Sequence, residues 1–326
     1  MERKYLSEAG LDVFTSYKTI IPIEGLKELE KIDNHKYHIY AILSYPQIYF
    51  NSEKTYVGED GIYMCLFNPI YDEEYILQKW DLGSGIDYSK VVMKYSYPYE
   101  KLEIIIEDEQ FLKEHPEIIV PNPIISAQDI FNVYAKYGIV EKREFEVLYI
   151  GQAYGQEGER TAFSRLSSHS TLQKILTDCQ GKYSDKHIYI MLMEFTPQLN
   201  ITFDGISGKY TMSEEEDKKH MDDVISNLPE EQQVINITEA ALINYFKPEY
   251  NVNFVENFPN ENHKGYKQYF DLDYNDLVVE IDLDFDDYSI IQLYSSTNRI
   301  NSSFDYIQYK LYNDNNRLSM YDIFHR

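Results

Sequence analysis

Short apolar runs rich in tyrosine, isoleucine, valine and phenylalanine recur along the whole chain, and this composition is typical of β-strands. One of them, residues 186–195, is almost continuously apolar, which predicts a central strand covered on both faces. Residues 278–285 instead alternate apolar and acidic side chains, which predicts a strand with one solvated face. Further strands are predicted over residues 36–45, 61–69, 145–151, 289–294 and 306–312.

Apolar positions at helical spacing predict helices between these strands. One amphipathic helix is predicted to extend to residue 179. It carries Arg165 and His169 on one face, because positions i and i+4 are neighbours on a helix surface. A charged helix is predicted from Ser213 to about residue 228, with three glutamates at the positive end of its dipole. A late helix is predicted to begin at Glu239 and to end before Pro248.

The segment 126–140 admits two interpretations. Ser126 and Asp129 have the spacing of a capping box, and apolar residues then run at helical spacing to Gly138, a residue typical of helix ends. These features predict a helix. Alternatively, residues 132–137 form a strand, because tyrosine and valine are also common in strands.

The composition is that of a globular protein. The chain has 326 residues, of which 43% are hydrophobic, so it is long enough for two or three domains with their own cores. No apolar run is long enough to cross a membrane, and the first residues lack the apolar stretch of a signal peptide. Two cysteines, Cys65 and Cys179, are too few for a disulfide framework. These features predict a cytoplasmic protein with no membrane partner.

The charge balance argues against a tight, non-specific grip on nucleic acid. The net charge is −25, whereas proteins that hold phosphate backbones usually carry a basic stripe. The acid is unevenly distributed: residues 1–130 contain 12 basic and 23 acidic residues, residues 257–326 contain 6 and 12, and residues 131–195 contain 8 of each. The neutral central segment permits a local phosphate site, and the acidic flanks are suited to a basic protein partner.

The most informative stretch joins a strand, a glycine-containing loop and a helix. The strand ends in Tyr149-Ile150-Gly151, and the helix that follows supplies Arg165 and His169. A tyrosine hydroxyl, a planar guanidinium and a titratable imidazole suit work on a phosphodiester. They provide a positioned proton acceptor, a cation that matches phosphate geometry and a proton shuttle.

Three features in this order resemble the GIY-YIG nuclease family. They are the Tyr149-Ile150-Gly151 motif, the Arg165-x3-His169 helix, and the late helix with Glu239 that is followed by a Pro-x-x-Asn sequence ending at Asn251. The resemblance covers residues 131–256.

The resemblance implies a role for each of these residues. Tyr149 would orient or deprotonate the attacking water, Arg165 would hold the scissile phosphate, and His169 would tune the tyrosine or carry the proton. Glu239 would bind a single divalent ion, Mg²⁺ or Mn²⁺, completed by waters and phosphate oxygens. Gly151 and Asn251 are expected on the substrate side of the site, where Asn251 supports it by hydrogen bonds.

The first tyrosine of the family motif has no clear counterpart. Gly61-Ile62-Tyr63 spells the motif literally, but Tyr63 lies 86 residues before Tyr149, whereas the family's first two strands normally form a hairpin. Tyr134 supplies the hydroxyl if residues 132–137 are a strand. Gly138-Ile139-Val140 fits the hairpin spacing but places a valine where a hydroxyl is expected. These alternatives stay open on the sequence alone.

The expected fold class is α+β, with a small, mainly antiparallel three-stranded sheet flanked by helices. This nuclease-like domain is expected over residues 126–256, with an insertion at about 197–231. It would lie between an N-terminal α+β region, residues 1–125, and an acidic β-rich extension, residues 257–326. The expected function is metal-dependent endonucleolytic cleavage of DNA, with RNA not excluded, in restriction, phage defence or a mobile element. The alternative is a catalytically inactive protein of the same fold, acting as an acidic interaction or DNA-mimic module.

Overall fold

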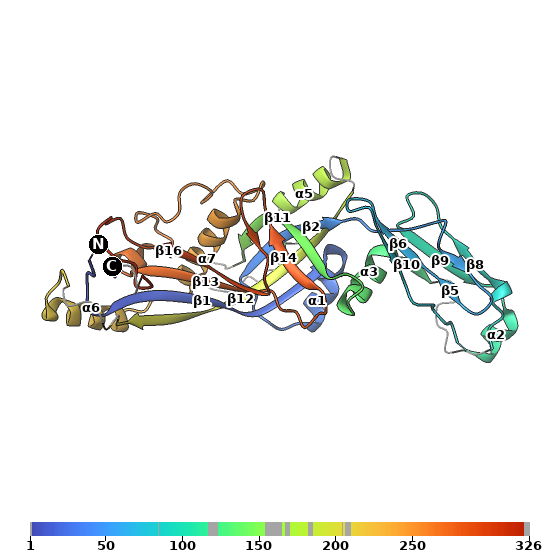
Figure 1. The fold of residues 1–326 in the computed structure, drawn as a ribbon, viewed down its shortest axis with the longest axis horizontal. Coiled ribbons are helices and arrows are strands. Elements are labelled where there is room, and N and C mark those ends of the chain that lie inside the picture. The colour runs from blue at the N-terminus through green and yellow to red at the C-terminus, as the bar shows by residue number, and fades with distance from the viewer. Residues whose placement is uncertain are drawn as a thin grey trace.

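The computed structural model describes residues 2–83, 85–116, 123–153, 165–166, 170–181, 185–203, 205 and 210–322. Its main feature is an eight-stranded mixed sheet with the order β15-β14-β11-β2-β12-β1-β13-β16 (Figure 1). The strands are β1 (Glu8–Pro22), β2 (Ile39–Pro46), β11 (Lys142–Gln152), β12 (Lys186–Thr202), β13 (Asp276–Asp282), β14 (Ile290–Tyr294), β15 (Arg299–Ile300) and β16 (Phe304–Lys310). The two longest strands, β1 and β12, are antiparallel neighbours along nearly their whole length.

The predicted fold class is wrong. The chain is mostly β, and the strands β11, β2 and β12 are inner members of the large sheet rather than a small sheet of their own. Two strands continue the sheet beyond β11, and three continue it beyond β12. Each of the three expected regions contributes strands to this one sheet. The division of the chain into those regions stays a prediction.

Strand β2 lies between two hydrophobic cores and contributes side chains to both. It is buried at every residue, as expected for an inner strand covered on both faces. Ile39, Ala41 and Leu43 belong to the larger core, together with the apolar side chains of α7 (Glu231–Phe246). The alternate residues Tyr40 and Ile42 belong to a smaller core. That core is completed by η1 (Ile23–Gly25), α1 (Leu26–Ile32) and α5 (Ser170–Gly181).

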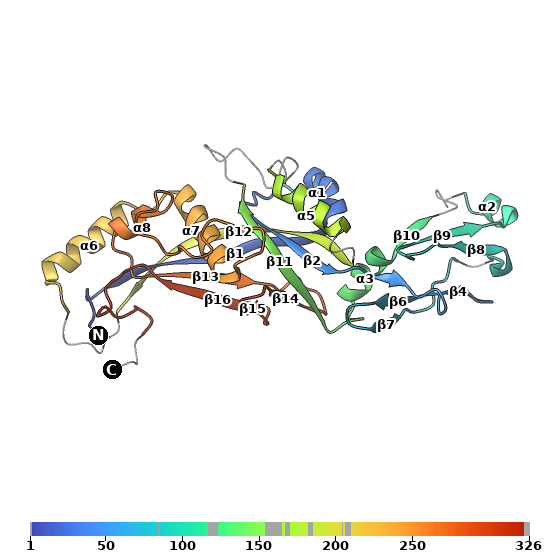
Figure 2. The ribbon, with the colours of Figure 1, turned by 90° about the horizontal axis from the view of Figure 1, so that it is seen from above.

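The described residues between 47 and 126, which connect β2 to α3 (Ala127–Lys136), form a lobe that projects from one end of the sheet, opposite to α6 (Glu214–Ser226) (Figures 1 and 2). Its small sheets have the orders β3-β6-β7, β4-β5 and β8-β9-β10. The elements are β3 (Tyr49–Phe50), β4 (Tyr56–Val57), β5 (Ile62–Tyr63), β6 (Cys65–Asn68), β7 (Glu73–Ile76), η2 (Tyr88–Lys90), β8 (Val91–Lys94), β9 (Lys101–Ile106), α2 (Glu109–Glu114) and β10 (Ile124–Ser126).

The structure decides between the two interpretations of residues 126–140. Helix α3 begins after Ser126, whose hydroxyl accepts a hydrogen bond from the Asp129 amide at 3.4 Å. Gly138 follows the helix with φ of 84°, a left-handed conformation that favours glycine. The helical interpretation is confirmed, and the strand alternative is wrong.

The predicted charged helix is present as α6. Ser213 caps it in a complete capping box with Glu216, as its sequence indicates. The late helix, α7, starts at Glu231 and not at Glu239, so Glu239 lies in its middle. A short helix, α8 (Lys267–Asp271), precedes β13.

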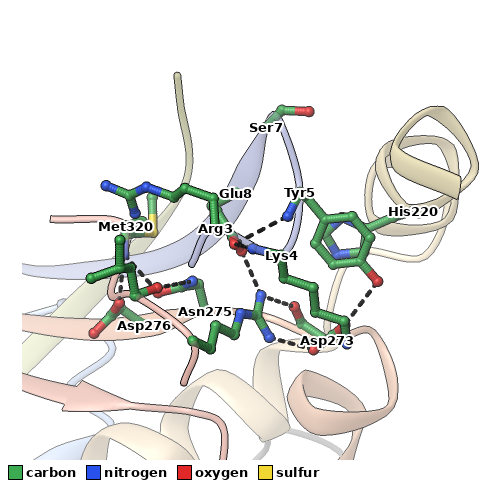
Figure 3. A network of polar contacts seen from close by, with 12 residues as sticks. Arg3, Lys4, Tyr5, Ser7, Glu8, His220, Asp273, Asn275, Asp276 and Met320 are labelled. Atoms are coloured by element: carbon green, nitrogen blue, oxygen red, sulfur yellow. Dashed lines mark hydrogen bonds and ion pairs between the residues drawn. The ribbon is translucent and has the colours of Figure 1, made fainter. Parts of the chain in front are cut away.

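A buried network of ion pairs connects residues near both ends of the described chain to the eight-stranded sheet (Figure 3). The side chains of Arg317 and Glu8 are each 2% exposed, and their closest nitrogen and oxygen atoms lie 2.5 Å apart. Arg317 also pairs with Asp273 at 2.6 Å, and the Tyr5 hydroxyl donates to Asp273 at 2.8 Å. This polar cluster thereby joins the N-terminal strand, the connection between α8 and β13, and the C-terminal segment.

Replacing Arg317 with alanine is expected to destabilise the protein by about 3–5 kcal/mol, because Glu8 would be left as an uncompensated buried charge. Denaturant unfolding measures the change. Lys267→Ala is the matched control, since Lys267 and Asp271 form an exposed pair, 48% and 56% exposed, that is expected to contribute less than about 1 kcal/mol. An Arg317→Ala variant as stable as the control would contradict the role given to this network.

Candidate functional site

The pairing of β2 with β11 brings a second tyrosine to the Tyr149-Ile150-Gly151 motif. The strands are antiparallel, with Tyr40 opposite Gly151 and Ile42 opposite Tyr149. Paired residues lie on the same face of a sheet, so Tyr40 and Tyr149 share a face. Their ring centroids are 6.1 Å apart. Tyr40 is fully buried, and Tyr149 is partly buried.

Gly151 is the position that makes this arrangement possible. A Cβ atom there would lie 2.7 Å from the Tyr40 hydroxyl oxygen and 2.7 Å from Cε1 of Tyr149. Real Cβ atoms do not approach other atoms so closely, so any side chain would displace one of the two rings. Only glycine lets both tyrosines lie over the end of β11. The expected role of Gly151 in substrate binding stays a prediction.

Asn251 fixes the same strand from its outer edge. Its side-chain oxygen accepts from the Ile150 amide at 2.9 Å, and its side-chain amide donates to the Ile150 carbonyl at 2.8 Å. The neighbouring Tyr250 amide donates to the Leu148 carbonyl at 3.1 Å. Because Asn251 follows α7 closely, these bonds hold the helix that carries Glu239 beside β11. Its expected contact with substrate stays a prediction.

Glu239 is buried at the end of β11. The residue as a whole is 8% exposed. Its Oε2 accepts a hydrogen bond of 2.6 Å from the side-chain amide of Gln152, the last residue of the strand. The same amide donates to Oδ1 of Asn236 at 2.8 Å. Burial raises the pKa of Glu239 from 4.5 to about 7, although the bonds from Gln152 and the charge of Arg165 oppose the shift. Glu239 lies in the middle of α7, away from the positive end of the helix dipole.

Arg165 lies within electrostatic reach of both tyrosines and of Glu239. Burial is the largest influence on the pKa of Tyr40 and of Tyr149, and it raises both. The Glu239 carboxylate raises these two pKa values further, whereas the Arg165 guanidinium lowers them. Gln152 and Tyr40 point to opposite faces of the sheet, and the Glu239 carboxylate nevertheless lies close enough to both tyrosines to influence their pKa values. The structure thus brings three of the four expected catalytic residues together; their catalytic roles stay predictions.

The fourth expected residue, His169, lies outside the described residues. The candidates for the first tyrosine lie elsewhere: Tyr63 is on β5 in the lobe, Tyr134 is in α3, and Val140 lies between α3 and β11. Sequence reasoning missed Tyr40. The signal was present, because His38-Ile39-Tyr40 begins a predicted strand and differs from the family motif only in its first residue. It was overlooked since Tyr40 lies 109 positions before Tyr149, far beyond a hairpin.

The donor set fits the expected divalent ion. Within the described ranges, no group of three or more His, Cys, Asp or Glu side chains is arranged to hold a metal. A metal at this site would therefore have at most two such ligands from these ranges, of which Glu239 would be one. Mg²⁺ commonly takes one or two carboxylates and keeps several waters. A buried carboxylate with a pKa of about 7 is also a group whose charge a bound cation would stabilise.

Comparisons of the chain with protein-family models, with curated proteins and with solved structures returned no match. Among the residues that the structure describes, no helix has both the length and the apolar character needed to cross a membrane.

Proposed function

We propose that the protein is a metal-dependent nuclease that hydrolyses phosphodiester bonds in DNA, with a site like that of the GIY-YIG family built into a larger sheet. The observation that carries the proposal is that Tyr40, Tyr149, Arg165 and Glu239 gather at one end of β2 and β11. Each residue alone has an ordinary structural explanation. Together they supply hydroxyls that position water, a cation for phosphate and a carboxylate for a metal.

Arg165 binds the scissile phosphate in this proposal. Its planar guanidinium matches two phosphate oxygens and stabilises the charge that develops on them during hydrolysis.

Tyr40 and Tyr149 orient the attacking water as neutral hydroxyls. Burial holds the pKa of both tyrosines above the usual value, so both keep their protons at neutral pH. This favours orientation of the water over its deprotonation by a phenolate. His169 stays the predicted proton shuttle.

Glu239 holds the metal, and Gln152 keeps its carboxylate directed at the end of β11. When bound, Mg²⁺ or Mn²⁺ would act as a Lewis acid and stabilise the leaving oxygen. The Gln152 side chain donates to Oε2, and in this proposal the remaining lone pairs of the carboxylate bind the cation.

The test is cleavage by the purified full chain of single- and double-stranded DNA and RNA with Mg²⁺ or Mn²⁺. Cleavage of DNA is expected with metal, and none is expected with a chelator. Arg165→Ala is expected to lower the rate about 10²–10³-fold, because it removes one stabilising donor of the transition state. Arg299→Ala is the matched control, since Arg299 forms a surface pair with Glu144 on another part of the sheet.

Equal rates for Arg165→Ala and the control would contradict the assignment of the phosphate site. Failure of the wild type to cleave any of the four substrates with either metal would instead favour the inactive, acidic interaction module. The effect of Mg²⁺ on thermal unfolding separates these two outcomes, because metal binding does not depend on turnover.

A further inference from the structure

The lobe contains an aromatic pocket of about 600 Å³ that the proposed nuclease chemistry does not use. Five aromatic side chains line it, namely Tyr49, Phe50, Phe67, Tyr97 and Tyr99. It lies at the Pro46 end of β2, six residues from Tyr40, and therefore about 20 Å along the strand from the candidate active site. Its contents would not reach the reacting phosphate.

The rim of this pocket is formed by an exposed tyrosine on a supported backbone. Tyr97 is 85% exposed, and its ring packs edge-on against that of Tyr99, with centroids 6.0 Å apart. Tyr99 has φ of 72°, a left-handed conformation that is unfavourable for a tyrosine. The Tyr99 carbonyl accepts from the Phe50 amide at 2.8 Å, and its amide donates to Ser96 at 2.8 Å. The ring of Tyr97 is thus presented to solvent on a loop anchored to β3.

The charged groups of the pocket are all acidic. Glu53, Glu74 and Asp185 line it, and no basic side chain is among its lining residues, all of which belong to the described part of the chain. Glu74 is paired with Lys54, which leaves Glu53 and Asp185 as the carboxylates available to a ligand. The lobe as a whole contains 6 basic and 15 acidic residues over residues 47–126. Such a field repels phosphate and attracts cations.

We propose that this pocket binds an arginine side chain presented by a basic protein partner. The face of a tyrosine ring attracts a cation, and a guanidinium stacks on it with its flat surface. The neighbouring carboxylates of Glu53 and Asp185 then receive the N–H groups of the same guanidinium. The aromatic walls alone would also suit a nucleobase, but the acidic surroundings oppose the phosphates that come with it. This inference is independent of the proposed nuclease activity.

The experiment is calorimetric titration of the full chain with a short arginine-rich peptide, a lysine-rich peptide of equal length and an oligothymidylate. The arginine peptide is expected to bind most tightly, and its affinity is expected to fall as salt is added. Tyr97→Ala is expected to weaken this binding about tenfold, because it removes the exposed ring, whereas Tyr97→Trp is expected to preserve or strengthen it.

Tyr56→Ala is the matched control for the ring. Tyr56 is a 52% exposed tyrosine on β4 of the same lobe, stacked on Tyr63 and outside the pocket. Both substitutions remove one phenol and change no charge, so non-specific attraction of the peptide to an acidic protein affects them equally. Glu53→Gln tests the carboxylate separately and is also expected to weaken binding.

Three results would overturn the proposal. They are the absence of peptide binding, equal affinities for Tyr97→Ala and Tyr56→Ala, and tighter binding of the oligothymidylate through the same ring. Nucleic-acid cleavage by Tyr97→Ala is expected to equal that of the wild type, since the pocket is remote from Arg165 and Glu239. A wrong assignment of arginine binding to the pocket and a wrong assignment of nuclease activity would therefore give different results.

Discussion

Replacing Glu239 with glutamine is expected to abolish metal-dependent cleavage and, at the same time, to stabilise the metal-free protein above neutral pH. The first effect follows because an amide is a poor ligand for a hard divalent cation. The second follows from the burial that raises the pKa of Glu239 to about 7. The two effects have opposite signs, so a variant that merely unfolds cannot imitate them.

The sign of the pH dependence follows from linkage. The pKa of Glu239 is higher in the folded protein than its ordinary value of 4.5, so folding favours the protonated carboxyl. The stability that this group contributes is fully present below about pH 4.5 and is lost as the pH rises through about 7. Above that pH the buried, metal-free carboxylate costs about 3 kcal/mol, a cost that the neutral glutamine does not carry.

Thermal unfolding with and without Mg²⁺ measures both effects. At about pH 8, Mg²⁺ is expected to raise the Tm of the wild type by binding the folded state, and to leave Glu239→Gln unchanged. Wild-type cleavage is expected to rise with pH through about 7, with a midpoint that falls as Mg²⁺ is increased, because metal and proton compete for one carboxylate.

Glu230→Gln is the matched control, since Glu230 is exposed next to the start of the same helix and its side chain makes no capping bond there. It is expected to behave as the wild type in both measurements. If Mg²⁺ stabilised Glu239→Gln as much as the wild type, Glu239 would not be the metal ligand, whatever the effect on cleavage.

The local elements of this site were predictable from the sequence. The apolar runs at residues 145–151 and 186–195 are the strands β11 and β12, and the glutamates after Ser213 open helix α6. Arg165 and Glu239 were selected by their order along the chain, and the structure places them within electrostatic reach of each other. These features depend on neighbouring residues, which is the information that a periodic pattern carries.

The parts that were missed depend on residues far apart in the chain. Strand β1 pairs in parallel with β13, so that Val13 lies opposite Val279, and the lobe separates β2 from β11. A periodic pattern contains no information about such pairings, and the small sheet was expected from the resemblance to the nuclease family. The start of α7 was missed for another reason. Helix α7 carries buried apolar side chains, such as Val234, Ile235 and Ile237, on more than one of its faces. This distribution leaves no polar stripe to mark where the helix begins.

The acidity of the chain is easier to reconcile with a nuclease once the fold is known. The lobe, which contributes 15 of the 55 acidic residues, projects from one end of the sheet (Figures 1 and 2). It follows Pro46, the last residue of β2, whereas Tyr40 lies near the start of that strand, and Glu239 accepts from Gln152, which pairs with Ile39. The lobe therefore accounts for a net charge of −9 (15 acidic and 6 basic residues) out of the total of −25, and this part of the acidic charge lies away from the candidate site. Arg165 is exposed to solvent.

Replacing Tyr40 with phenylalanine is expected to lower cleavage about 10²-fold or more while changing the free energy of unfolding by no more than about 1–2 kcal/mol. The substitution keeps the ring that occupies the space over Gly151 and removes only the hydroxyl. The loss should fall on kcat rather than KM, because this hydroxyl orients the attacking water and not the phosphate. Single-turnover cleavage measures it directly.

Tyr134→Phe and Tyr63→Phe are the matched controls, because these are the tyrosines that the sequence offered for the same role. Tyr134 is in α3 and Tyr63 is on β5 of the lobe, so neither hydroxyl faces the site, and both variants are expected to cleave at the wild-type rate. Loss of cleavage in Tyr134→Phe with normal cleavage in Tyr40→Phe would show that the strand pairing of β2 and β11 does not build the active site. The dependence of cleavage on Tyr40 thus tests whether the pairing of β2 with β11 brings residues before and after the lobe into one catalytic arrangement.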